Sequence, residues 1–116
     1  MSELLGKEIH LLLDSAGALI VFQEKGVPWA GVLAFSSEDK AREFCARSHL
    51  DAAEIGAIAT DDREAVASLV SSIKRRAIRN LLLDLDYQTG ACTQIDFNGD
   101  SLGELTPRQF TPPVHH

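Results

Sequence analysis

Short apolar runs separated by polar turn-forming clusters fill the first third of the chain. The runs Ile9–Leu13, Ala18–Gln23 and Trp29–Phe35 have the length and the β-branched or aromatic content of strands. The connections between them are too short for a crossover, and connections of that length join antiparallel neighbours. The pattern therefore predicts a β-meander.

Helical spacing begins directly after the third run. Ser36 or Ser37 is placed to be the N-cap of a first helix, because its side-chain oxygen can accept from an orphan N–H in the first turn. The pattern ends near His49. The residues spaced to share an apolar face are Ala41, Phe44 and Cys45.

A second helix follows the apolar run Ile55–Ala59. Asp61 with Glu64 three residues later resembles a capping box, so we expect Asp61 to be the N-cap. Lys74, Arg75 and Arg76 stand in the last turns, where cations favour the negative end of the helix dipole. The expected buried stripe consists of Val66, Leu69, Val70, Ile73 and Ala77.

Two further strands, Asn80–Asp84 and Ala91–Phe97, complete an α/β fold. The order of elements is strand–strand–strand–helix–strand–helix–strand–strand, in one mixed six-stranded sheet. Crossovers through the helices should make the third, fourth and fifth strands a parallel centre with antiparallel ends. The alternating run Ala91–Phe97 is typical of an edge strand. We expect a single domain over residues 1–106 and a proline-rich tail over 107–116, whose His115-His116 end is as typical of cloning as of a natural sequence.

Composition and charge narrow the class of protein. The 116 residues are 45% apolar and 24% charged, as in an average globular domain. The net charge of −6 argues against nucleic acid as the main partner, and no stretch approaches the ~20 apolar residues of a membrane span. Two cysteines, Cys45 and Cys92, are too few for a disulfide framework and no signal-peptide pattern is present, so we expect a cytoplasmic protein with reduced thiols.

Four carboxylates could meet at the carboxyl ends of the predicted parallel strands, where open α/β sheets bind ligands. They are Asp61, Asp62, Asp84 and Asp86. Together they could hold Mg²⁺, which favours oxygen ligands. Asp84-Leu85-Asp86 after an apolar run resembles the nucleophile strand of haloacid-dehalogenase-type phosphotransferases, although Thr89 stands one position late and few residues follow Gly90. We favour the alternative that these aspartates cap a helix and shape turns.

Other motifs are better explained by structure than by chemistry. Asp96–Asp100 has the first ligand spacing of a calcium loop but lacks the glycine at position six, so a surface turn is favoured. Neither His10 nor His49 is tied to a cysteine by a recognisable motif, which favours structural thiols. Lone Trp29 is expected in the core. The basic residues Lys74, Arg75, Arg76 and Arg79 could meet an anionic partner, but a solvated helix end explains them.

Two stretches resemble a known family. Trp29–Phe44, an apolar strand followed by a capped helix, and the turn from Leu81-Leu82-Leu83-Asp84 to Gly90 are similar to segments of SseB-like bacterial domains, over about half of the chain. That family is small, cytoplasmic and without an established activity. The resemblance therefore implies no catalytic residues and favours a non-enzymatic interaction domain.

These observations lead to one main functional hypothesis and two alternatives. We expect a non-enzymatic protein–protein interaction module with no metal and no cofactor. Two helices cannot cover both faces of an apolar sheet, so we also expect a homodimer built on the helix-poor face or along a sheet edge. The alternatives are a Mg²⁺-dependent phosphate-handling enzyme that uses the four aspartates, and a small-ligand sensor binding at the same strand ends.

Overall fold

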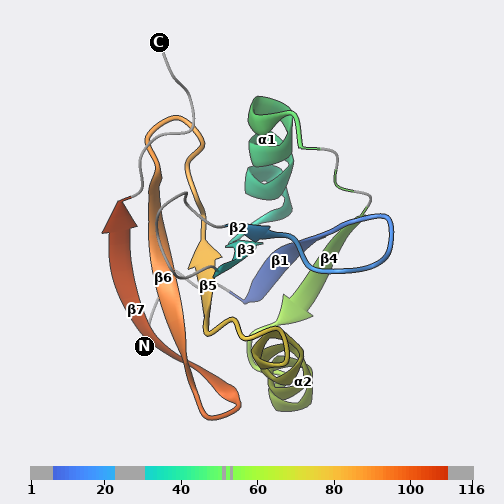
Figure 1. The fold of residues 1–116 in the computed structure, drawn as a ribbon, viewed down its shortest axis with the longest axis vertical. Helices are drawn as coiled ribbons and strands as arrows, with labels where there is room; N and C mark the ends of the chain where they lie inside the picture. The colour runs from blue at the N-terminus through green and yellow to red at the C-terminus, as the bar shows by residue number, and fades with distance from the viewer. Residues whose placement is uncertain (1–6, 23–30, 51, 53, 110–116) are drawn as a thin grey trace.

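One mixed sheet organises the chain, and two helices connect three of its strands (Figure 1). The computed structural model describes residues 7–22, 31–50, 52 and 54–109; the predicted core position of Trp29 and the His115-His116 end lie outside them. In chain order the elements are β1 (Glu8–Leu13), β2 (Val21–Phe22), β3 (Gly31–Phe35), α1 (Glu38–Ser48), β4 (Glu54–Ala59), α2 (Arg63–Lys74), β5 (Asn80–Leu83), β6 (Ala91–Asn98) and β7 (Ser101–Gln109).

The α/β class and the mixed sheet are confirmed, but the order of strands differs from the prediction. The sheet has seven strands in the order β4-β1-β3-β5-β6-β7, and β2 pairs with β3. Among the described strands, only β3 and β5 form a parallel pair. The predicted parallel centre is therefore wrong, because β1 lies between β3 and β4 and pairs antiparallel with both. The short connections in the first third of the chain predicted that strands consecutive in sequence would be neighbours in the sheet. Instead, β1 pairs along its full length with β4.

A hairpin at the end of the sheet accounts for the extra strand. β6 and β7 pair antiparallel from Ala91 opposite Gln109 to Asn98 opposite Ser101, around the turn residues Gly99 and Asp100. Gly99 has a φ of 62°, which explains a glycine there. The predicted calcium-like segment is thus the hairpin turn that we favoured. The expectation that β6 is an edge strand is wrong, since β7 covers it, and residues 107–109 of the expected tail belong to β7.

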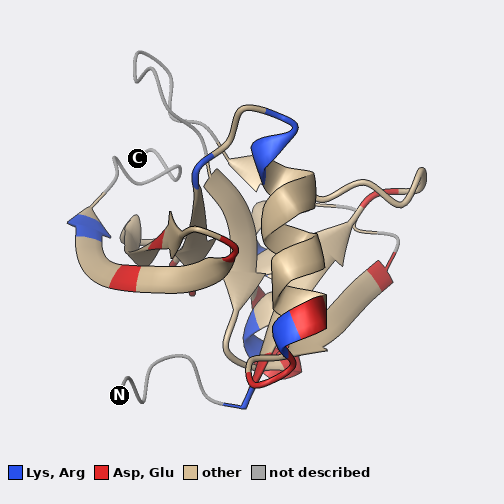
Figure 2. Ribbon diagram, turned by 90° about the horizontal axis from the view of Figure 1, so that it is seen from below, with Lys and Arg blue, Asp and Glu red and all other residues tan. Residues whose placement is uncertain are grey.

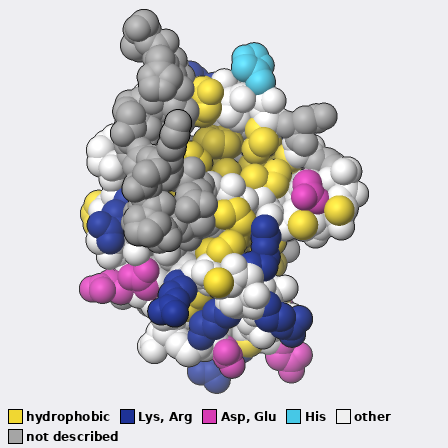
Figure 3. All heavy atoms as spheres, viewed as in Figure 1, with side chains coloured by type: hydrophobic (Ala, Val, Ile, Leu, Met, Phe, Trp, Pro, Cys, Tyr) yellow, Lys and Arg dark blue, Asp and Glu magenta, His cyan; other side chains and the backbone are white. Residues whose placement is uncertain are grey.

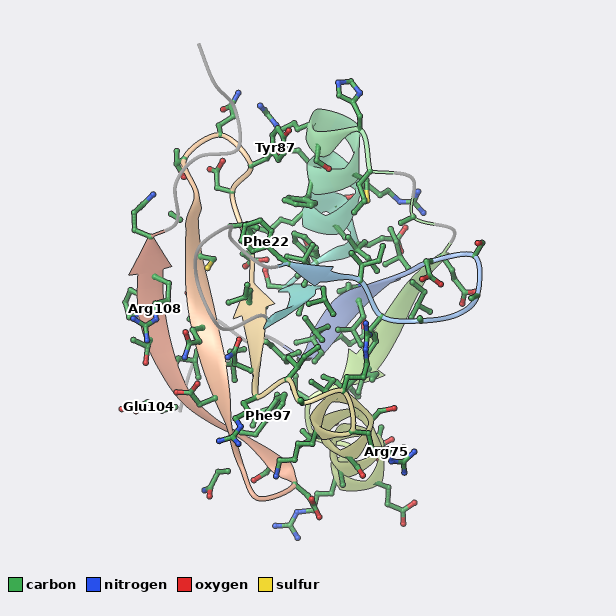
Figure 4. All side chains as sticks on the ribbon, viewed as in Figure 1. Phe22, Arg75, Tyr87, Phe97, Glu104 and Arg108 are labelled. Atoms are coloured by element: carbon green, nitrogen blue, oxygen red, sulfur yellow. The ribbon has the colours of Figure 1, made fainter. Side chains whose placement is uncertain are left out.

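The two helices lie on opposite faces of the sheet. α1 crosses from β3 towards β4, and α2 returns from β4 to β5, so crossovers of one hand place them on different faces. Phe44 of α1 packs with Leu33 and Phe35, while Ile73 of α2 packs with Val32 and Leu81. Figure 4 shows Phe97 of β6 between the strands and α2, where it packs against the same cluster as Ile73. We call these faces the α1 face and the α2 face.

The helix boundaries follow local chemistry. Ser37, one of the two expected candidates, is the N-cap of α1 and accepts from the Lys40 N–H at 3.2 Å. The helix ends at His49 as expected, and His49 adopts the left-handed region. The N-cap of α2 is Asp62, which accepts from the Ala65 N–H at 3.1 Å, so the prediction of Asp61 is wrong by one residue.

The predicted stripe of α2 is confirmed at four of its five positions. Val66, Leu69, Val70 and Ile73 are buried. Ala77 is exposed with a φ of 61°, because the helix ends at Lys74 and the chain turns back there. Its place in the core is taken by Ile78, whose N–H donates to the Ile73 carbonyl.

Candidate functional site

The carboxyl ends of β3, β4 and β5 open at the same edge of the sheet. β3 and β4 both run antiparallel to β1, and β5 runs parallel to β3, so all three strands point the same way. This is the edge at which the sequence placed Asp61, Asp62, Asp84 and Asp86.

Asp84 joins the ends of β3 and β5. Its Oδ1 accepts from the Ser36 N–H and its Oδ2 from the Ser36 hydroxyl, both at 2.8 Å. The Lys40 ammonium lies 3.4 Å from Oδ2. Asp84 has a φ of 55°, a conformation that aspartate tolerates better than most residues. The carboxylate is therefore committed to holding two strand ends and the start of α1 together.

The other three carboxylates serve turns and caps or face solvent. Asp86 accepts from the backbone N–H groups of Gln88 and Thr89, at 2.8 and 3.3 Å, and so shapes the turn into β6. Asp62 caps α2. Asp61 is exposed beside Thr60 at the end of β4.

The four aspartates do not form one site. β1 and β3 lie between β4 and β5, and at about 4.8 Å per strand this separates the two pairs by about 14 Å. Within the part of the chain that the structure describes, no group of three or more His, Cys, Asp or Glu side chains could hold a metal ion. The sequence argument assumed that β4 and β5 were close in the sheet, and the insertion of β1 removes that assumption.

A small cavity lies beside Asp84, between α1 and the turn after β5. It encloses about 220 Å³ and includes Phe44 and Tyr87, whose rings meet edge to face with centroids 5.9 Å apart. Ligand sites usually enclose about 300–1,000 Å³, so this cavity is small for a metabolite. Lys40 and Arg47 at its rim are already near Asp84 and Glu43.

The two thiols are poor nucleophiles. Burial raises the pKa of the Cys92 thiol from 9.0 to about 11, against the opposing charge of Arg108. Burial also raises the pKa of Cys45, opposed by Arg42. Both thiols are free, Cys92 is buried, and Cys45 is half-buried at the flank of α1. Because the thiolate is the reactive form, both residues remain mainly protonated and structural at neutral pH.

The basic cluster at the C-terminal end of α2 is tied to the rest of the fold. The Lys74 ammonium donates to the Gly99 carbonyl at 2.7 Å, and the Arg76 guanidinium donates to the Leu19 carbonyl at 2.8 Å. Figure 2 shows the Lys and Arg residues at this end of α2, and Figure 3 shows basic side chains over the same region. The interpretation favoured from the sequence is a solvated helix end; these exposed side chains also hold the helix end to the β6–β7 turn and to the segment before β2.

A groove between α1 and β4 brings apolar side chains together beside an edge strand of the sheet. It encloses about 460 Å³, and we call it the α1–β4 groove. Cys45, Leu50, Ala52 and Ile55 are all half-buried within it. Among the described strands, β4 is the last of the sheet on this side. The full lining is Glu38, Arg42, Cys45, Leu50, Ala52, Glu54 and Ile55.

Sequence reasoning missed this groove because it placed β4 inside the sheet. A signal was present in the composition of the strand. β4 reads Glu-Ile-Gly-Ala-Ile-Ala, with three small residues, whereas the interior strand β5 reads Asn-Leu-Leu-Leu. Small residues fill less of a core and are more compatible with a sheet margin than large aliphatic residues.

Comparisons with known proteins add no further assignment. Neither a protein-family model nor a curated protein matches the chain. The resemblance to SseB-like domains therefore stays a prediction. Neither described helix is long and apolar enough to cross a membrane.

Proposed function

We propose that this protein is a non-enzymatic interaction module that associates with a second copy of itself through the α1–β4 groove. The observation that carries the proposal is the set of half-buried apolar side chains along this groove, Cys45, Leu50, Ala52 and Ile55. Apolar surface gathered beside a sheet edge that no described strand covers is the kind of surface that protein partners bury. The commitments of Asp84, Asp86 and Asp62 to structural hydrogen bonds favour this function over a phosphate-handling enzyme.

Self-association is the simplest way to cover the groove. Homo-oligomers are most often two-fold dimers, in which one patch meets its own copy. The groove is also lined by three charged residues, Glu38, Arg42 and Glu54, beside its apolar side chains. An apolar centre with a polar rim is the usual arrangement of a protein interface. A cytoplasmic location fits the free, protonated thiols, and we propose it together with the function.

Sedimentation tests the proposal. We expect the protein at micromolar concentration to sediment at twice its 12.6 kDa mass. Ala52→Glu places a charge in the groove without removing a core side chain, and it should raise the dissociation constant at least about tenfold, a loss of about 1.4 kcal/mol.

Ala67→Glu is the matched control, because Ala67 is also a half-buried alanine but lies on α2, on the other face of the sheet. This variant should associate as the parent does. A protein that remains a 12.6 kDa monomer at hundreds of micromolar would show that the groove is not a self-association site.

A further inference from the structure

We infer that the edge of β4 away from β1, which no described strand covers, pairs antiparallel with β4 of a second copy, so that two sheets join into one. This inference rests on the proposed function and specifies how the two copies meet. It depends on the backbone of β4, whereas the proposed function depends on the side chains of the groove.

The hydrogen bonds around β1 show which backbone groups of β4 point outwards. The Thr60 N–H donates to the Lys7 carbonyl at 2.9 Å, in register with the pairing of β1 and β4. Backbone groups alternate in direction along an antiparallel strand, so those of Glu54, Gly56 and Ile58 also face β1.

The alternate residues must then face away from β1. The partner of Ile55 is Leu12, and the Leu12 carbonyl accepts from the Ile20 N–H at 3.0 Å, on the side of β1 opposite to β4. Ile55, Ala57 and Ala59 therefore direct their N–H groups out of the sheet, as do the carbonyls of Ile55 and Ala57. The Ala59 carbonyl accepts from the Asp62 N–H at 3.2 Å. β4 ends the order of strands, so no other described strand pairs with these groups.

The two edge strands of the sheet differ in the features that prevent pairing with a strand of another chain. β7, at the other edge, contains Glu104, Pro107 and Arg108, and the β6–β7 pairing has an irregularity between Ile95 and Phe97. Figure 4 shows Glu104 projecting away from β7, while Arg108 lies on the strand and its Nε donates to Gln94 Oε1 of β6 at 2.8 Å. Charges, proline and bulges are the usual protection of an edge against pairing. β4 has a single charge, at its first residue, and neither proline nor a bulge in its pairing with β1.

A second copy of β4 fits this edge in one register that uses all three outward residues. With Ala57 opposite Ala57 of the second copy, Ile55 lies opposite Ala59 on both sides of the two-fold axis. The two Ala57 residues exchange two N–H···O bonds. In each Ile55–Ala59 pair the Ala59 N–H donates to the Ile55 carbonyl, and the Ile55 N–H donates to the second lone pair of an Ala59 carbonyl that also accepts from Asp62. Glu54, the only charge in the strand, then lies opposite Thr60, so no like charges oppose one another within the ladder.

The side chains on this register support the same pairing. Ile55 packs with the α1-face cluster, and alternation places Ala57 and Ala59 on that face too. Ala57 is exposed, and its small side chain lets a neighbouring strand approach. The ladder would continue directly into the α1–β4 groove, where Ile55 is a lining residue. A single interface would therefore include both the paired β4 strands and the buried side chains of the α1–β4 groove.

Amide hydrogen exchange at two protein concentrations tests the inference. The N–H groups of Gly56 and Ile58 should be protected at both concentrations, because they bond within the chain. Those of Ile55, Ala57 and Ala59 should exchange rapidly in the monomer, and at least about tenfold more slowly at a concentration where the protein sediments as a dimer.

Ala57→Pro provides a second readout. Proline removes an outward N–H that makes no bond within the chain, so the monomer tolerates it at an edge position. We expect Ala57→Pro to weaken dimerisation at least about tenfold relative to Ala57→Val, which keeps the N–H.

The outcomes separate this inference from the proposed function. A dimer whose Ile55, Ala57 and Ala59 amides still exchange rapidly would overturn strand pairing and leave the groove as the interface. Equal dimerisation of Ala57→Pro and Ala57→Val would do the same. A protein that is monomeric throughout would overturn both, and protection induced only by a strand of a different protein would overturn the choice of a second copy.

Discussion

Ala77 adopts a backbone conformation that alanine disfavours. It follows α2, is exposed, and has a φ of 61°, a left-handed conformation that costs an L-residue roughly 1–2 kcal/mol. The position closes the helix end, since the Ala77 N–H donates to the Lys74 carbonyl at 2.9 Å. Glycine is the usual residue at such a position.

Replacing Ala77 by glycine should therefore stabilise the protein. We expect Ala77→Gly to raise the free energy of unfolding by about 1 kcal/mol, measured by urea denaturation. The matched control is Ala67→Gly inside α2, where glycine should cost about 1 kcal/mol instead. Effects of the same sign at both positions would contradict the left-handed conformation of Ala77.

Cys92 predicts a specific pH dependence. Burial raises the pKa of this thiol from 9.0 to about 11, so the native state keeps its proton between these values while the unfolded chain releases it. The native state then binds more protons than the unfolded state, and the free energy of unfolding must fall as pH rises through the window.

Urea denaturation between pH 8.5 and 11 measures this dependence. The stability of Cys92→Ala should fall less steeply than that of the parent over the same range, because alanine has no proton to release. Parallel slopes for the two proteins would mean that the thiol is not shielded from water as the structure indicates.

At the scale of single elements, the capping residues decide where each helix begins. Ser37 and Asp62 both have extended backbone conformations and both accept from an N–H three residues later. The sequence identified Ser37 among two candidates but chose Asp61 over Asp62. Two adjacent aspartates offer the same chemistry, and only the direction in which the chain leaves β4 selects one.

The choice can be tested with a matched pair of substitutions. Asp62→Ala should cost about 0.5–2 kcal/mol of stability, because the Ala65 N–H loses its acceptor. Asp61→Ala, at an exposed neighbour that does not cap the helix, should stay within about 0.5 kcal/mol. A larger loss for Asp61→Ala in thermal or urea denaturation would restore the capping box expected from the sequence.

At the scale of the whole molecule, one sheet is shared by two clusters of buried side chains. Phe44 belongs to the cluster on the α1 face and Leu69 to the cluster on the α2 face. β3 and β5 contribute to both, because neighbouring residues such as Leu81 and Leu82 point to opposite faces. The two faces should therefore unfold together, as in most single domains of this size.

Truncation on either face should reduce the stability of the whole chain. We expect Leu69→Ala to cost about 2–5 kcal/mol and Phe44→Ala about 3–5 kcal/mol. In each variant, amide exchange should accelerate in β5 as a whole. Ser68→Ala, on the exposed side of α2, should change the free energy of unfolding by less than about 0.5 kcal/mol. Acceleration confined to the helix that carries the substitution would show that the faces unfold independently.

The sequence by itself determined the local features of this protein. The first strands, the buried positions Val66, Leu69, Val70 and Ile73, the Ser37 cap and the surface turn at Gly99 all depend on residues close together in the chain, and the structure confirms them, whereas β7 was not predicted. The structural roles favoured for Asp84 and Asp86 were also legible, because aspartate after a strand commonly serves a turn.

Only the tertiary structure decided which strands are neighbours. The pairing of β1 with β4 joins residues that are more than 40 positions apart, and no local pattern states it. That one pairing separates Asp61 and Asp62 from Asp84 and Asp86, moves β4 to the edge, and creates the α1–β4 groove. Apolar runs specify that a strand is buried or half-buried, but any antiparallel partner of matching length can satisfy the same backbone groups. The choice among partners belongs to the packing of the whole molecule.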